Sequence, residues 1–251
     1  MMQDKSYFFF VLLMSLRYLV MAGLAFVIFY VLFRERFRRI KIQRLFPKSR
    51  DYYRELKFSM LTMLIFTAYA VVIFRSPVSG FTQLYEDISE FGIVYFLASV
   101  LVAIFVHDTY FYWTHRLMHN PKLFRIFHLV HHKSTNPSPW TAYSFHPLEA
   151  IVEGGVIVVI VFLFPIHRYA IGLFMLFMLT FNIYGHLGYE LFPRWLVRSR
   201  VGRWLNTSTN HNMHHKLFNG NYGLYFRFWD ILMGTTHPKY DETLNQIHSA
   251  K

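Results

Sequence analysis

Three short stretches of the sequence hold histidines at spacings that suit a metal site. In the first, His115 and His119 are four residues apart, which brings both imidazoles to one face of a helix. The other two stretches share the pattern His-x-x-His-His, which is expected to place three imidazoles on one helical face. Their members are His128, His131 and His132, and then His211, His214 and His215. These eight imidazoles predict a metal centre.

Eight neutral imidazoles are more than one ion needs, so they predict two metal ions side by side. A single pair could be an ordinary polar contact, but chance explains three such boxes poorly in a chain with few polar residues. Imidazole binds zinc, copper, iron and nickel, and the ligands alone do not choose among them. A two-metal site facing lipid favours oxygen activation, because unactivated C–H bonds need the oxidant that iron and dioxygen supply. The absence of cysteine excludes haem-thiolate and iron–sulfur sites.

Composition indicates that lipid is the main solvent of this protein. Hydrophobic residues make up 54% of the 251 residues, and charged residues only 16%, against about 25% in soluble domains. This excludes a disordered chain, a collagen-like fibre and an ordinary soluble enzyme. The net charge of +12 could indicate nucleic-acid binding. In so apolar a chain an anionic membrane surface is the better partner, and no nucleic-acid partner is expected.

Apolar runs predict an all-α polytopic membrane bundle with four to five transmembrane helices, because about 20 apolar residues span a bilayer. The runs cover residues 7–33, 58–74, 91–106, 148–164 and 169–184. The third is expected to continue as a helix through Trp113. The first is too long for a signal peptide and has no small-residue cleavage site, so we expect it to be retained.

Loop charge predicts the orientation of the bundle. Residues 34–57 contain ten Lys or Arg and three acidic residues, whereas residues 75–90 contain one Arg and three acidic residues. The basic loop should therefore be cytoplasmic. Five spans then place the C-terminus and every histidine box on the cytoplasmic side, as a metal cap. The predicted organisation is an N-terminal membrane helix with a basic loop at residues 1–57, followed by a catalytic domain at residues 58–251.

The boxes and their surroundings resemble the sterol desaturase/fatty acid hydroxylase superfamily, especially its sterol C5-desaturase-like members. The resemblance lies in residues 107–119, 131–149, 185–190, 206–215 and 221–235. It covers about residues 91–236, and the combination of boxes in this order is highly specific.

The resemblance implies an integral membrane oxidoreductase with a histidine-ligated di-iron centre. Such an enzyme uses dioxygen to hydroxylate or desaturate a lipid and takes electrons from an external reductase chain, through a cytochrome b5-like or ferredoxin-like donor. The expected cofactors are thus two iron ions and dioxygen. Zinc can replace iron in recombinant samples, because it outcompetes ferrous iron for imidazole.

Several further residues are candidates around the boxes. His186 ends the fifth span and is expected as a ninth ligand, and Glu190, one turn further on, either ligates metal or orients an imidazole. Asp108 could accept an imidazole N–H, cap a turn or pair with an arginine. The predicted metal ligands are His115, His119, His128, His131, His132, His186, His211, His214 and His215.

Other polar and aromatic residues receive weaker predictions. His107 and His146 are not expected to bind metal, although neither is excluded as a ligand. Residues expected to be solvated are His167, His237 and His248. An aromatic belt at the membrane interface is expected from Trp140, Tyr143, Tyr222, Tyr225 and Trp229.

Three rival functions fit parts of the sequence. Desaturation of a sterol ring is the main rival to hydroxylation, and residues 138–149 favour it. A metal transporter would place its ligands midway along the spans, whereas these boxes lie at helix ends. A zinc hydrolase would use three ligands and an open position, which leaves most of these histidines unexplained.

Overall fold

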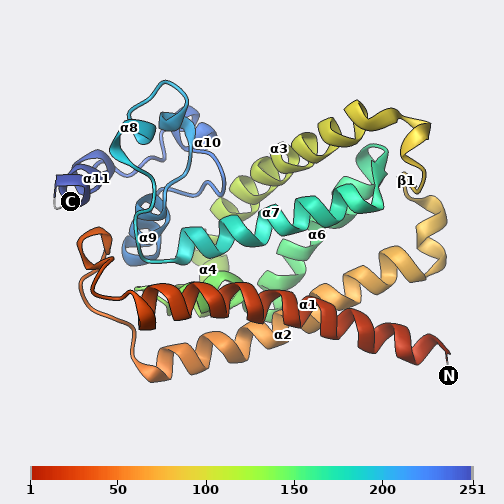
Figure 1. Ribbon diagram of the computed structural model, residues 1–251, viewed down its shortest axis with the longest axis horizontal. Helices are drawn as coiled ribbons and strands as arrows, with labels where there is room; N and C mark the ends of the chain where they lie inside the picture. Colours follow the sequence, from red (N-terminus) through yellow and green to blue (C-terminus); the bar gives the residue numbers. More distant parts are fainter. Residues whose placement is uncertain (1, 250–251) are drawn as a thin grey trace.

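The computed structural model describes residues 2–249, which form a helical bundle with a compact cap at one end (Figure 1). The long helices are α1 (Met2–Phe26), continued by the π-helical η1 (Val27–Leu32), α2 (Ser49–Arg75), α3 (Gly92–Met118), α6 (Pro147–Leu163) and α7 (Arg168–His186). The short helices are α4 (Pro121–Phe127), α5 (Leu129–His132), α8 (Arg194–Val197), α9 (Ser208–Leu217), α10 (Phe228–Leu232) and α11 (Tyr240–Ser249). The predicted all-α class is confirmed.

Short 3-10 turns and one small parallel strand pair complete the described chain. The turns are η2 (Arg38–Ile40), η3 (Pro77–Phe81), η4 (Ile88–Glu90), η5 (Pro139–Tyr143) and η6 (Gly202–Trp204). Strand β1 (Leu84–Tyr85) pairs with β2 (Ile166–His167), with Leu84 opposite Ile166. This pairing ties the α2–α3 connection to the α6–α7 connection at one end of the bundle.

Four helical segments are long and apolar enough to cross a membrane: Phe8–Leu32, α2, α3 and α7. They coincide with predicted apolar runs. The structure corrects two boundaries, because α2 begins at Ser49 and α3 continues to Met118. Charged residues such as Arg50 and Arg54 hide the start of α2 from a hydropathy pattern, although they continue the same helix.

The fifth predicted span is α6, which is shorter than the others. Its 17 residues extend about 25 Å, less than the roughly 30 Å of a hydrocarbon core. It nevertheless reaches the end of the bundle marked by β1 and β2. The segment before it accounts for its length, because η5 packs against α1, α2 and α7 and carries the chain into the bundle before α6 begins.

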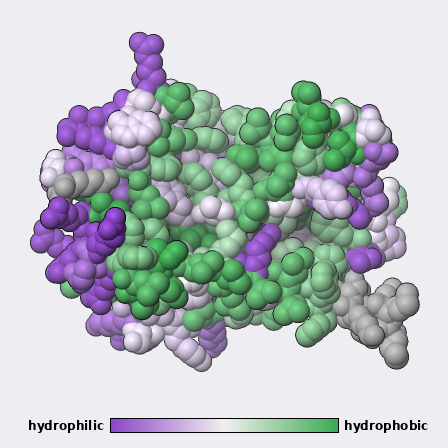
Figure 2. Space-filling view, viewed as in Figure 1, coloured by the Kyte–Doolittle hydropathy of each residue, from purple (hydrophilic) through white to green (hydrophobic). Residues whose placement is uncertain are grey.

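The surface divides into an apolar middle and polar ends. Hydrophobic side chains cover the middle of the molecule, and hydrophilic ones gather at its two ends (Figure 2). Exposed apolar residues follow the long helices, as Leu24 does on α1 and Val94 does on α3. This is the pattern of a bundle whose sides face lipid.

The basic loop and the histidine boxes lie at the same end of the bundle, as predicted. The backbone N–H of Ile42 donates to the carbonyl oxygen of Gly188 at 3.0 Å. Nearby, Gln43 Nε2 donates to Oδ1 of Asn212, in the third box, at 2.9 Å. The loop after α1 therefore helps to hold the cap that carries the boxes.

Candidate metal centre

The first box lies where α3 ends. His115 is in the last turn of the helix and His119 is its C-cap. The helix stops there because Pro121 begins α4, and a residue before proline disfavours the helical conformation. Asn120 Oδ1 accepts the N–H of Lys122 and caps α4, so the chain turns sharply and leaves both imidazoles at the turn.

The second and third boxes are held differently. His128 sits between α4 and α5, and His131 and His132 are on α5. The third box occupies α9, whose N-cap Thr207 accepts the N–H of Asn210 through its hydroxyl at 3.1 Å. Residues 208–215 of α9 are all buried, so its histidines face protein on every side.

The structure brings all nine predicted ligands into two adjacent groups. Within each group, one ligand atom per residue lies within 4.8 Å of all the others. Group one consists of His115, His119, His128, His132 and His214. Group two consists of His131, His186, His211 and His215.

Each His-x-x-His-His box contributes to both groups, which corrects the expectation that its three imidazoles share one face. His128 and His132 belong to group one and His131 to group two. The third box does the reverse, since only its middle member His214 belongs to group one. Adjacent residues of a helix differ by about 100°, so members i+3 and i+4 diverge to opposite sides of member i.

In group two the Nε2 atoms of the four imidazoles converge. His186 Nε2 lies 2.9 Å from His211 Nε2, 3.1 Å from His215 Nε2 and 3.2 Å from His131 Nε2. The Nδ1 atom of His186 donates to the carbonyl oxygen of Asn182 at 2.8 Å. Neutral His186 therefore presents a lone pair at Nε2. Converging lone pairs repel one another and are stabilised by a cation, so this group fits a metal ion.

Group one fits a metal ion in the same way. His115 Nδ1 donates to the carbonyl oxygen of Tyr222 at 2.9 Å, and His214 Nδ1 donates to that of Gly220 at 2.8 Å. His128 Nδ1 lies 2.6 Å from Glu149 Oε1. Within residues 2–249 the buried Nε2 atoms of His128 and His214 have no hydrogen-bond partner. A histidine that binds metal usually has one ring nitrogen held by a hydrogen bond, here Nδ1, while the other, here Nε2, is free to bind the ion.

Burial keeps these imidazoles neutral at physiological pH. It lowers the pKa of His214 to about 4 and that of His119 to about 2, where neighbouring His214 contributes further. Burial, together with neighbouring imidazoles, also holds the pKa of His128 and His215 well below the ordinary value. Neutral imidazole is the form that binds metal, so the site is prepared for cations rather than protons.

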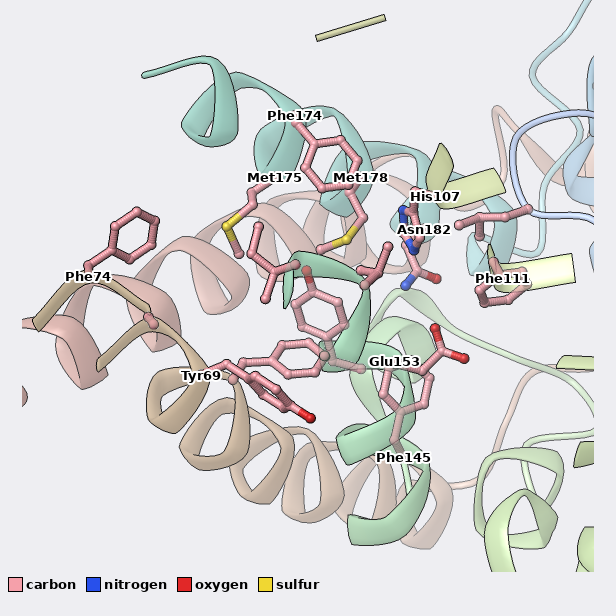
Figure 3. A pocket seen from close by; sticks show the side chains of 17 residues that line it. Tyr69, Phe74, His107, Phe111, Phe145, Glu153, Phe174, Met175, Met178 and Asn182 are labelled. Carbon is pink, nitrogen blue, oxygen red and sulfur yellow. The ribbon is translucent and has the colours of Figure 1, made fainter. Parts of the chain in front are cut away.

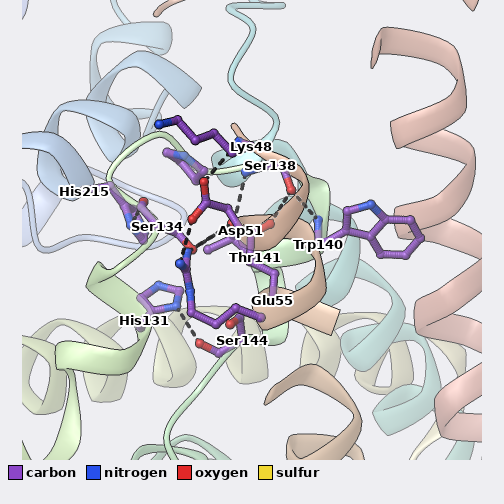
Figure 4. Close-up of polar contacts among 12 residues, drawn as sticks. Lys48, Asp51, Glu55, His131, Ser134, Ser138, Trp140, Thr141, Ser144 and His215 are labelled. Atoms are coloured by element: carbon purple, nitrogen blue, oxygen red, sulfur yellow. Dashed lines mark hydrogen bonds and ion pairs between the residues drawn. The ribbon is translucent and has the colours of Figure 1, made fainter. Parts of the chain in front are cut away.

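A buried carboxylate braces the loop that orients group two (Figure 4). Glu55 on α2 accepts the hydroxyl of Ser134 at 2.7 Å and that of Ser138 at 2.5 Å. The carbonyl oxygen of Ser134 accepts His215 Nδ1 at 3.1 Å. Glu55 was not among the predicted site residues. Its position next to a run predicted to span the membrane was the feature that could have indicated a role.

Glu190 is not among the grouped ligand atoms. Its Oε2 accepts the backbone N–H and the hydroxyl of Thr209, at 3.0 and 2.6 Å, and its Oε1 accepts the hydroxyl of Tyr184 at 3.2 Å. Glu190 therefore anchors the first turn of α9 and does not touch an imidazole. Asp108 likewise accepts backbone amides, those of Tyr225 and Phe226, rather than an imidazole N–H.

The remaining histidines lie outside both groups. His146 caps α6, where its Nδ1 accepts the N–H of Leu148. His167 and His248 are buried, so the expectation that they are solvated is wrong. His167 Nε2 donates to the carbonyl oxygen of Glu86 beside the β1–β2 pair, and His248 Nε2 donates to that of Phe192. His237 is half-buried.

The expected aromatic belt is also partly wrong. Tyr143, Tyr222 and Tyr225 are buried, with Tyr225 completely so, and only Trp140 and Trp229 are half-buried. The hydroxyl of Tyr225 lies 2.7 Å from His107 Nδ1. Tyr143 packs against Tyr18 and Phe66 inside the bundle, whereas Tyr222 and Tyr225 pack against side chains of α3. A hydropathy pattern cannot distinguish such buried tyrosines from interfacial ones.

An apolar cavity lies beside the histidine groups, between α2, α3, α6 and α7 (Figure 3). Phe111 and Phe145 line its inner end, with ring centres 4.8 Å from His115 and 5.1 Å from His131. Phe74 lines the opposite end and is half-buried. The cavity is therefore lined mainly by apolar side chains and has one end next to the histidines.

Glu149→Gln should weaken metal binding about 10–100-fold, because the neutral amide no longer stabilises the N–H of His128. Resistance of the bound metal to a chelator measures this. Glu153→Gln is the matched control, since Glu153 lies one turn further along α6 and is also buried, but outside both groups. Equal metal retention in Glu149→Gln and the wild type would contradict the role of Glu149.

Comparison with known proteins identifies relatives of this chain. The chain is 30% identical over 196 residues to Delta(7)-sterol 5(6)-desaturase ERG3B of Gibberella zeae, which covers 78% of this chain and 59% of that protein. It is 31% identical over 189 residues to lathosterol oxidase of Rattus norvegicus, covering 74% and 61%. The human lathosterol oxidase is 28% identical over 184 residues, covering 72% and 60%.

The matches extend over about 60% of the length of these curated relatives. No solved structure matches the chain. The profile of the family described as fatty acid hydroxylase matches residues 100–235, which include all nine grouped histidines. Together with four apolar helices of spanning length, this indicates an integral membrane protein. The chain belongs to the fatty acid hydroxylase family.

Proposed function

We propose that this protein is a membrane-bound oxidoreductase that uses dioxygen and external electrons to hydroxylate or desaturate a lipid. The observation that carries the proposal is the pair of adjacent all-histidine groups at the inner end of an apolar cavity. The family supports the same reaction class, and the names of the relatives favour desaturation of a sterol ring as the specific outcome.

The nine grouped histidines are the proposed ligands of two iron ions. Iron held there would supply the oxidising power that an unactivated C–H bond requires. Imidazole ligation also suits zinc, so recombinant protein can carry zinc in its place. The carbonyl oxygens of Asn182, Tyr222 and Gly220 fix the ring orientations and so hold the ligand nitrogens in place before metal arrives.

The cavity supplies positioning and exclusion of water. Its walls are aromatic and aliphatic, so a lipid displaces solvent when it enters. Phe111 and Phe145 stand between the cavity and the imidazoles and set how closely a substrate carbon approaches. Selection of one C–H bond among many similar ones depends on how the cavity walls orient the substrate.

Electrons are proposed to come from a separate reductase chain, through a cytochrome b5-like or ferredoxin-like donor. The chain has no cysteine and therefore cannot hold an iron–sulfur cluster of its own. A metal transporter fits less well, because the grouped histidines lie at one end of the bundle rather than midway along it. A zinc hydrolase would leave most of the nine imidazoles without a purpose.

The orientation follows from loop charge. A reporter fused after Lys251 should read cytoplasmic, and one inserted near Glu86 should read external, because the basic loop lies at the histidine end and Glu86 follows β1 at the other. A fusion within residues 34–48 that also reads cytoplasmic is the internal control. Reversed readings at Lys251 and Glu86 would place the boxes outside.

Comparative lipidomics of cells with and without the protein tests the activity itself. Hydroxylation adds one oxygen atom to a lipid, and desaturation removes two hydrogen atoms, so either gives a defined mass change. The wild type should produce such a lipid, and the His131→Ala variant should not. Identical lipid profiles with and without the wild-type protein, under aerobic conditions, would contradict the proposal.

A further inference from the structure

Three polar side chains stand out in the otherwise apolar cavity. They are His107 on α3, Glu153 on α6 and Asn182 on α7, which are 3%, 7% and 7% exposed. Figure 3 shows all three at the end of the cavity where Phe111 and Phe145 lie, away from Phe74. The polar groups are therefore collected at the inner end, next to the histidine groups, rather than spread along the cavity.

Two of these three side chains form hydrogen bonds within the described part of the protein, and the third does not. His107 Nδ1 pairs with the hydroxyl of Tyr225, and Asn182 Nδ2 donates to the carbonyl oxygen of Ala142 at 2.9 Å. Within residues 2–249 no hydrogen bond to the carboxyl group of Glu153 is found, and this group lines the cavity (Figure 3). A polar group that is removed from water without a hydrogen-bond partner is destabilised, so a ligand that supplies the partner gains affinity.

The inner end is distinct from the metal ligands but adjacent to them. None of the three polar residues belongs to either histidine group. Asn182 is nevertheless one turn before His186, whose Nδ1 donates to its carbonyl oxygen. The ring of Phe111 lies between His107 and His115, with centres 6.2 and 4.8 Å away. A polar group bound here would hold nearby substrate carbons close to the metal centre.

The opposite end of the cavity is lined by partly exposed residues. Tyr69, Phe74 and Met175 lie toward this end and are half-buried, whereas the residues of the inner end are buried (Figure 3). An amphiphile can therefore place its polar group at the inner end while its apolar body fills the cavity. A substrate entering the other way would leave Glu153 unpartnered against hydrocarbon.

The geometry points to a hydroxyl-binding site formed by Glu153, with His107 and Asn182, that recognises the hydroxyl group of a 3-hydroxysterol-like substrate. This inference rests on the proposed function in taking the cavity as the place of the substrate. It fits a sterol because the ring hydroxyl lies close to the carbons that a 5(6)-desaturase oxidises. The carboxyl of Glu153 and the hydroxyl exchange hydrogen bonds, and the ring system packs along the aromatic walls.

Equilibrium binding of two probes to the purified, metal-containing protein tests this site. The probes are lathosterol and its 3-deoxy counterpart, cholest-7-ene, which differ only in the hydroxyl. The wild type should bind lathosterol at least about tenfold more tightly, the effect of one well-made hydrogen bond to a buried group. Glu153→Leu should bind both probes with the affinity of the deoxy compound. Glu153→Gln, which keeps hydrogen-bonding atoms, should retain most of the preference.

The controls separate a lost site from a damaged protein. Unchanged affinity for cholest-7-ene shows that the cavity of a variant is intact, and Met178→Leu, an apolar change in the same cavity, should keep the full preference. If Glu153→Leu does not yield metal-containing protein, the His107→Phe variant is tested in the same assay. It should also lose the tighter binding of lathosterol relative to cholest-7-ene.

Three results would overturn the inference: equal affinity of the wild type for both probes, no binding of either, or an undiminished preference in an intact Glu153→Leu or His107→Phe variant. Binding requires no turnover, so it is independent of the proposed reaction. A clear preference without any oxygen-dependent lipid oxidation would refute the proposed function alone. Lipid oxidation without the preference would refute the hydroxyl site alone.

Discussion

His186→Ala is expected to lose both turnover and the ion of group two. Its Nε2 lies within 3.2 Å of the other three ligand nitrogens of that group, so its removal leaves three ligands around an enlarged space. The loss of affinity should exceed the roughly 100-fold that changes to outer hydrogen-bond partners produce. Metal content should fall from about two ions per chain to about one.

Metal analysis and a turnover assay on the same preparation measure this effect. His237→Ala is the matched control, because His237 is half-buried outside both groups, where its Nδ1 accepts the N–H of Lys239. That variant should keep its metal and its rate. Full metal content with a reduced rate in His186→Ala would show that His186 positions other groups and does not bind metal. Wild-type metal content and rate would show that α7 contributes nothing to the site.

The double variant His131→Ala/His211→Ala should empty one metal position and leave the other untouched. Its two residues come from different boxes but belong to the same group, so group one keeps all five of its histidines. About one ion per chain should remain, with the chelator resistance of the wild type, and turnover should be undetectable because both ions are needed.

Two further variants complete this test. His132→Ala/His214→Ala removes two members of group one and should lose the other ion, while group two stays complete. Combining all four changes should leave almost no bound metal. If each box instead formed its own metal site, His131→Ala/His211→Ala would weaken both ions together, which contradicts the crossed arrangement.

The sequence predicted the helices well because hydropathy reports directly on residues that face lipid. It misplaced the start of α2, since charged residues continue a helix beyond the apolar run. It also gave no sign that η5 folds into the bundle, and the short α6 follows from that. Burial of η5 depends on hydrogen bonds to Glu55 from another helix, which a local pattern does not contain.

The nine candidate ligands were predictable because histidine is rare in an apolar chain and their spacing is helical. Their division into two groups was not, because it depends on how α5 and α9 face each other. Most orienting partners were also hidden, since the carbonyl oxygens of Tyr222, Gly220 and Ser134 are backbone atoms that every residue has. Glu149 was part of a recognised motif, but its contact with His128 appears only in three dimensions.

Metal analysis of the active, purified wild-type protein tests the central claim most directly. Two groups of histidines, each with converging lone pairs, predict about two ions per chain in the fraction that oxidises lipid. Zinc in place of iron in an inactive recombinant sample would keep the same count. Full activity from protein that carries one ion or none would contradict the account.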